Sequence, residues 1–159
     1  MRVFAVSGYS GTGKTSLIEV LIKELVEDGF SVATIKSSKH EPGPEKGTDT
    51  WRHRQAGASV TLFLIADEDQ IDLRERIGKE NLEKIGDHDF LVIEGMKTVE
   101  IPRFWCIGNA DLNLEDVPAG TQAIVTWDLK PHLVSDIPIF TTNEVKRLVE
   151  IVKKTSKPI

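Results

Sequence analysis

An eight-residue segment near the N-terminus constrains this chain more than any other feature of its sequence. Residues 8–15 read Gly-Tyr-Ser-Gly-Thr-Gly-Lys-Thr and match the pattern G-x-x-x-x-G-K-S/T without a gap or a substitution. An apolar run at residues 3–6 comes just before this segment, and a helix-like run at 17–26 comes just after it. A strand, a glycine-rich turn and a helix in this order predict a phosphate-binding loop. The alternative is a glycine-rich turn that only joins the strand to the helix.

The residue types in this loop are those that phosphate chemistry requires. Its glycines let the backbone turn tightly and bring N–H groups close to phosphate oxygens, and the helix N-terminus adds partial positive charge. We expect Lys14 to reach the β- and γ-phosphates and the Thr15 hydroxyl to ligate Mg²⁺. The predicted nucleotide-binding residues of the loop are Gly8, Ser10, Gly11, Thr12, Gly13, Lys14 and Thr15.

The composition is that of one ordinary soluble domain. The chain has 159 residues, of which 40% are hydrophobic and 28% charged, and we expect a single domain over 1–159. A net charge of −5 argues against a broad nucleic-acid surface. Cys106 is the only cysteine, which excludes an internal disulfide and a cysteine metal cluster. Because we find no signal peptide and no apolar stretch long enough to span a bilayer, we expect a cytoplasmic protein with no membrane partner.

Strand and helix patterns alternate along the chain. This alternation predicts βαβ units and a three-layer, doubly wound α/β fold with a mainly parallel sheet. Pro138 indicates that the last strand is short or at an edge, and we expect Asn143 to cap the last helix. The expected strands are 2–7, 31–36, 59–65, 90–93, 104–107, 122–126 and 137–140; the expected helices are 14–28, 50–57, 73–86 and 143–155, with a turn at 67–70.

Acidic residues flank the apolar run at 90–93. Ligands of open parallel sheets bind beyond the carboxyl ends of the strands. Asp89 precedes the run and Glu94 follows it, so their Cα atoms are expected on the order of 16 Å apart. Only Glu94 falls at the phosphate end, where it is our candidate for the second coordination shell of Mg²⁺ or for positioning a water; a solvated loop acid is the alternative. Lys14 and Glu94 are thus the catalytic candidates, and Lys97, just after Gly95, is expected at the same rim.

A polar loop over residues 37–49 follows the second predicted strand. Lys36 ends that strand and is expected to face the site, whereas His40 and Asp49 lie on the loop. These three side chains could contact the γ-phosphate or a second ligand, and an ordinary solvated loop is the alternative. The four histidines of the chain are too scattered to predict a zinc site.

Together these motifs resemble the molybdopterin-guanine dinucleotide biosynthesis adapter (MobB) family. Their order and spacing match that family across nearly the whole chain, and the combination is far more specific than the phosphate loop alone. The matching segments are SGYSGTGKT at 7–15, IK at 35–36 followed by His40, GTDT at 47–50, RQAGA at 54–58 and DFLVIEGMK at 89–97.

The resemblance implies a P-loop nucleoside triphosphate hydrolase fold with GTP as the bound nucleotide. It also implies Mg²⁺, weak GTP hydrolysis, a homodimer, and an adapter role beside the nucleotidyltransferase MobA in the conversion of molybdopterin to its guanine dinucleotide. Carried across by position, Ser16 joins the phosphate-binding residues, Asp49 joins Thr15 and Glu94 as a candidate metal ligand, and Arg54 lines the remaining site. The second ligand would be molybdopterin or its guanine dinucleotide, with Lys36, His40, Asp49, Arg54 and Lys97 as candidate contacts.

Two positions depart from the family pattern, and the base contact is undefined. Ser37 stands where the family often has histidine, and Thr48 stands where it usually has lysine. Both lie in the loop expected to face a second ligand. No N-K-x-D motif marks a guanine site, so Asp128, just after the strand predicted at 122–126, is our best candidate for the base. Asn109 and Asp111 are an alternative, as turn residues or as base contacts.

Two other functions fit the same motifs. A small-molecule kinase using ATP would carry an arginine-rich lid, which Arg52, Arg54, Arg74 and Arg76 could supply. A nucleotide-gated interaction module would instead order the 37–49 loop around the γ-phosphate. If a dimer forms, we expect an apolar strand within 60–73 or near 104–107 to pair across it.

Overall fold

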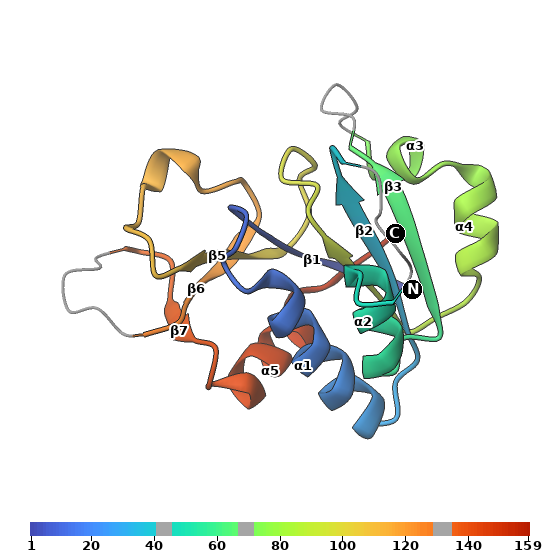
Figure 1. Cartoon of the computed structure of the whole chain (residues 1–159), viewed down its shortest axis with the longest axis horizontal. Coiled ribbons are helices and arrows are strands. Elements are labelled where there is room, and N and C mark those ends of the chain that lie inside the picture. The colour runs from blue at the N-terminus through green and yellow to red at the C-terminus, as the bar shows by residue number, and fades with distance from the viewer. Residues whose placement is uncertain (41–45, 67–71, 129–134) are drawn as a thin grey trace.

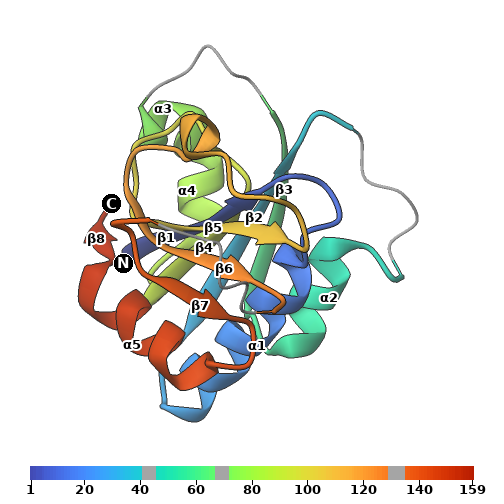
Figure 2. The ribbon, with the colours of Figure 1, turned by 90° about the vertical axis from the view of Figure 1, so that its left-hand side faces the viewer.

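Within the residues that the structure describes, seven parallel strands form the centre of the molecule in the order β3-β2-β4-β1-β5-β6-β7, and a short eighth strand pairs antiparallel with β1 (Figure 1 and Figure 2). The structure is a computed structural model that describes residues 1–40, 46–66, 72–128 and 135–159. The strands are β1 (Arg2–Gly8), β2 (Val32–Ser38), β3 (Val60–Ile65), β4 (Phe90–Glu94), β5 (Arg103–Gly108), β6 (Thr121–Thr126), β7 (Ile139–Thr141) and β8 (Lys157–Pro158). The helices are α1 (Lys14–Glu27), α2 (Asp49–Ala56), α3 (Leu73–Ile77), α4 (Lys79–Ile85) and α5 (Val145–Thr155), with a 3₁₀ turn at Leu114–Asp116.

The alternation of side chains along β1 explains the three layers. Phe4 and Val6 pack with α1 and α5 in one core cluster, whereas Val3 and Ala5 pack with α3 and α4 in another. Figure 2 shows α1, α2 and α5 on one side of the sheet and α3 and α4 on the other. This arrangement confirms the predicted three-layer α/β fold. It also places the carboxyl ends of β1, β2 and β4 at one edge, where the loop after β1 begins.

Two expectations about the helices were wrong. The helix expected at 73–86 is two helices, α3 and α4, because Gly78 between them has φ 80° and ψ 150°, which no helix accommodates. Asn143 does not cap α5. The helix begins at Val145 with Glu144 as its N-cap, and the Glu144 carboxylate accepts a hydrogen bond from the Thr141 backbone N–H at 2.9 Å.

Of the two strands that were candidates for pairing in a dimer, only one lies at an edge of the sheet. β7 is a short edge strand, as Pro138 predicted, and β3 forms the other end of the strand order. β5 lies between β1 and β6, so the hypothesis of a free edge near 104–107 was wrong, and only β3 keeps that possibility. The turn expected at 67–70 lies outside the described residues, as does part of the 37–49 loop. None of the described helices has the length and apolar character needed to cross a bilayer.

Candidate functional site

The loop between β1 and α1 has the geometry that its glycines predicted. Gly13 is the N-cap residue of α1 with φ 83°, a left-handed conformation that favours glycine, and the first turn of α1 contains no acidic residue. The Lys14 ammonium group donates to the backbone carbonyls of Gly8 and Tyr9. Burial lowers the pKa of Lys14, and the nearby charge of Lys36 adds to this effect while Glu94 opposes it. A positive helix N-terminus and a lysine therefore face the same space.

This loop forms one wall of a pocket of about 260 Å³. The other walls come from β2, α2 and β4, which are far apart in the sequence. Among the described residues, the lining consists of Ser10, Gly11, Thr12, Gly13, Lys14, Thr15, Ser16, Lys36, Asp49, Arg52 and Glu94. The structure therefore brings the predicted loop residues from Ser10 to Ser16 together with Lys36, Asp49 and Glu94, whereas Gly8 lines a neighbouring pocket.

Glu94 is the centre of the polar contacts in this pocket. Its side chain is 1% exposed, and its Oε1 accepts hydrogen bonds from the Thr15 hydroxyl and the Lys36 ammonium group, both at 2.8 Å. Its Oε2 lies 2.9 Å from Nε2 of His53. Because a carboxylate only accepts hydrogen bonds, Nε2 must be the donor. Burial alone would raise the pKa of Glu94, but the bond from His53 and the charge of Lys36 outweigh it and lower the pKa to about 2.

Sequence reasoning missed His53, which is completely buried. Its Nδ1 lies 3.1 Å from the Thr34 hydroxyl on β2, so the imidazole links β2 to Glu94 on β4. His53 and Asp49 are four residues apart in α2 and therefore share one face of that helix. This spacing was the available signal, but it identifies a partner only when the position of α2 against the sheet is known.

Lys36 joins the two carboxylates of the pocket. Its ammonium group lies 2.8 Å from Oδ2 of Asp49 and the same distance from Oε1 of Glu94. Burial alone would lower the pKa of Lys36, but the two carboxylates outweigh it and raise the pKa. Lys36 is therefore a fixed positive charge at this site.

The oxygen donors of the pocket fit a magnesium ion that phosphates and water largely coordinate. The described residues contain no cluster of three or more His, Cys, Asp or Glu side chains suited to a metal, so an all-protein site is absent from that part of the chain. The pocket instead offers a few hard oxygen ligands: the Thr15 hydroxyl, the Glu94 carboxylate to which it is hydrogen-bonded, and the Asp49 carboxylate that pairs with Lys36. Mg²⁺ in phosphate sites takes this kind of partial protein coordination.

Arginine 52 lines the pocket where Arg54 was expected. The Arg52 guanidinium donates to the Ser16 hydroxyl at 3.1 Å and pairs with Glu19. Arg54 is exposed and donates to the Thr61 hydroxyl on β3, outside the lining of the pocket.

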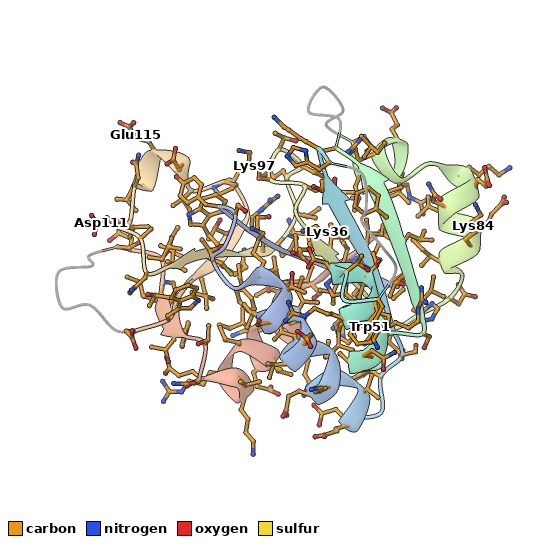
Figure 3. The ribbon with its side chains drawn as sticks, in the orientation of Figure 1. Lys36, Trp51, Lys84, Lys97, Asp111 and Glu115 are labelled. Atoms are coloured by element: carbon orange, nitrogen blue, oxygen red, sulfur yellow. The ribbon has the colours of Figure 1, made fainter. Side chains whose placement is uncertain are left out.

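Of the remaining predicted second-ligand contacts, Lys36 and Asp49 line the pocket, whereas His40 and Lys97 are outside its lining. His40 is exposed, and its backbone N–H bonds to the Ser38 hydroxyl. Lys97 lies on the loop after β4, apart from Lys36 on β2 (Figure 3), and lines a different pocket.

The base candidates lie beyond β5 and β6. Asp128 is exposed just after β6, and its backbone carbonyl accepts a hydrogen bond from the Thr126 hydroxyl at 3.0 Å. Its neighbour Trp127, which sequence reasoning did not single out, is 42% exposed and stands against the phosphate loop: a Cβ added to Gly13 would lie 2.8 Å from the indole nitrogen. Asp111 lies well apart from Lys36 in Figure 3.

The sequence is similar to one family of known proteins. The sequence profile of the family described as "MobB: Molybdopterin guanine dinucleotide synthesis protein B" matches residues 3–126. A putative molybdopterin-guanine dinucleotide biosynthesis adapter protein of Methanocaldococcus jannaschii is 36% identical over 70% of this chain and 49% of its own length. The molybdopterin-guanine dinucleotide biosynthesis adapter protein of Escherichia coli is 28% identical over 94% of this chain and 90% of its own length. The chain spans about half the length of the first of these relatives.

Solved structures show the same fold. The crystal structure of Bacillus subtilis MobB has a TM-score of 0.66 at 24% identity, and the comparison covers 100% of both chains. HypB from Helicobacter pylori, in complex with nickel, has a TM-score of 0.62 at 16% identity, over 100% of this chain and 91% of that one. At these identities the likeness concerns the P-loop fold alone.

Proposed function

This chain belongs to the MobB family of molybdopterin guanine dinucleotide synthesis proteins, and from that premise we propose that it is a GTP-binding adapter with slow GTPase activity. One observation carries the proposal: Lys14, Thr15 and Glu94 come together in a pocket at the carboxyl edge of a parallel sheet. In this proposal Lys14 exchanges the carbonyls of Gly8 and Tyr9 for the β- and γ-phosphates. The N–H groups at the start of α1 hold the remaining phosphate oxygens.

The Thr15 hydroxyl and Glu94 would hold Mg²⁺, directly or through a water, with Asp49 beside them. The bound ion would neutralise charge on the phosphates. With a pKa of about 2, Glu94 is a carboxylate throughout the physiological range and a poor proton acceptor. It can orient a water but takes its proton inefficiently, which supports slow hydrolysis.

Guanine recognition would fall to the segment after β6. The Asp128 carboxylate can accept hydrogen bonds from the ring N–H and the amino group of guanine, which adenine cannot donate in the same arrangement. The exposed indole of Trp127 lies against Gly13 and directly precedes Asp128 in the sequence, so it offers an apolar face beside the nucleotide.

The partners follow from the family and are part of the proposal. We expect a homodimer that works in the cytoplasm beside MobA and presents GTP, or a molybdopterin product, to that transferase. The outer edge of β3, which ends the strand order, remains the candidate for pairing between two copies.

Hydrolysis and transfer of a labelled γ-phosphate test the proposal. We expect slow, Mg²⁺-dependent release of phosphate from GTP, lost in Lys14→Ala and unchanged in Lys84→Ala, which changes an exposed lysine of α4. Arg52 in the pocket lining keeps the second candidate, a small-molecule kinase, in the comparison. Transfer of the labelled phosphate from ATP to an organic acceptor would contradict the adapter proposal and support the small-molecule kinase.

A further inference from the structure

A second pocket, of about 190 Å³, lies on the other side of β2 from the first. Successive residues of a strand face opposite sides, so Lys36 lines the first pocket and Ser37 lines the second. Gly8, the first residue of the phosphate loop, forms part of the second pocket's wall. The two pockets therefore lie side by side at the same edge of the sheet, separated by backbone.

The second pocket is lined by cations. Lys39, Arg76 and Lys97 contribute to its wall, and none of the described residues that line it is acidic. The Arg76 guanidinium is held in place because it donates to the Ile65 carbonyl at 2.7 Å and to the Ser37 hydroxyl at 3.3 Å. Three positive side chains, from the segment after β2, from α3 and from the loop after β4, thus line one pocket, which favours an anionic ligand.

A buried arginine, Arg103 on β5, adds to the positive charge near this pocket, because it is hydrogen-bonded to Met96 in the pocket wall. Arg103 is 0% exposed, and its guanidinium donates to the Ser7 hydroxyl at 3.0 Å, to the Met96 carbonyl at 3.1 Å and to the Val99 carbonyl. These partners are all neutral, and within the described ranges Arg103 forms no ion pair. Burial lowers its pKa to about 10, so it remains charged at neutral pH. A buried charge without a counterion is costly and is felt strongly by groups around it.

The backbone of the loop above Arg103 is held in an unusual conformation. Gly95 has φ 104° and Met96 has φ 52°, and Met96 is the one described non-glycine residue with positive φ. A Cβ added to Gly95 would lie 2.6 Å from the Ser37 carbonyl, so only glycine allows this loop to close against β2. Strained backbone of this kind persists where surrounding structure enforces it, and it concentrates at ligand sites.

We propose that this second pocket binds the phosphate group of a small phosphorylated organic molecule while the first pocket holds a nucleotide. Arg76 and Lys97 pair with the phosphate, and the Ser37 hydroxyl lies within reach of its oxygens. The pocket is smaller than the first and suits the phosphate group of a monoester whose organic part remains outside it. This inference goes beyond the proposed function, because it depends neither on GTP preference nor on hydrolysis.

Backbone amide chemical shifts report each pocket separately in a protein of this size. The probe is glycerol 3-phosphate, with glycerol as the neutral control. We expect saturable shifts of the amides of 37–39 and 95–98 in the wild-type protein and equally in Lys14→Ala. Lys97→Glu and Arg76→Gln should weaken this binding at least five-fold, Arg76→Lys should retain most of it, and Lys84→Glu on α4 should leave it unchanged.

Three results would overturn the second site. Shifts confined to residues 10–16 and lost in Lys14→Ala would show that only the phosphate loop binds the probe. Shifts at 37–39 and 95–98 that persist at full strength in Lys97→Glu and Arg76→Gln would exclude the proposed cations. No shift in either set would also reject the pocket, and a separate titration with GTP would show whether the first pocket fails with it.

Discussion

Replacing Glu94 by glutamine should remove most of the acid sensitivity that this residue gives to folding. In the folded protein the pKa of Glu94 is about 2, against an ordinary value of 4.5. A depressed acid pKa stabilises the folded state above the unfolded pKa, and this stabilisation is lost as the pH falls toward the folded value. The difference corresponds to about 3 kcal/mol of unfolding free energy, of which about 2 kcal/mol should be gone by pH 3. The side chain is 1% exposed, so solvent screening removes little of this.

Urea unfolding between pH 6 and pH 3 measures this effect. The unfolding free energy of the wild-type protein should fall by about 2 kcal/mol more than that of Glu94→Gln over this range. Glu83→Gln, which changes an exposed glutamate of α4, should keep the wild-type dependence. Parallel curves for wild type and Glu94→Gln would refute the claim that His53 and Lys36 stabilise a buried carboxylate.

Three further results follow from the same structure. Gly13→Ala should lower the unfolding free energy by more than about 1 kcal/mol, because the new Cβ lies 2.8 Å from the Trp127 indole and alanine also disfavours φ 83°. Gly29 has φ 90° and open space around it, so Gly29→Ala should lose only the free energy of the unfavourable backbone angle. Equal losses in the two variants would exclude a steric clash between the new Cβ and Trp127. Nucleotide binding should change the tryptophan fluorescence, and Trp127→Phe should abolish the change, whereas an unaltered signal in that variant would place the nucleotide away from this indole. The Cys106 thiol is buried and burial raises its pKa to about 12, so a thiol reagent should modify it only after unfolding; rapid modification of the folded protein would contradict its burial.

Local sequence patterns predicted most of the fold because they act over short distances. The motif at 8–15 predicted the strand before it and the helix after it. The buried run at 90–93 predicted a strand that ends with Glu94 at the phosphate end of the sheet. The break at Gly78 was missed because apolar residues recur on both sides of it, although a glycine at this position is itself a helix-stop signal. The start of α5 was missed because Glu144 bonds back to Thr141 and leaves Asn143 outside the helix.

The side chains of the site depend on how distant elements meet. Asp49 was expected at the site, but its ion pair with Lys36 and the contact of His53 with Thr34 form only when α2 packs on β2. Arg52 and Arg54 differ by two residues and therefore face different sides of α2, which composition and motif spacing did not resolve. Lys97 was predicted at the correct edge of the sheet, but the twist of the loop after β4 directs it to the second pocket.

Calorimetric titration of the protein with GTP and with ATP, each with Mg²⁺, tests the central claim most directly. We expect GTP to bind tightly and ATP weakly, with binding lost in Lys14→Ala and retained in Lys84→Ala. Equal or tighter binding of ATP, or GTP binding that survives the loss of Lys14, would contradict the proposed nucleotide site.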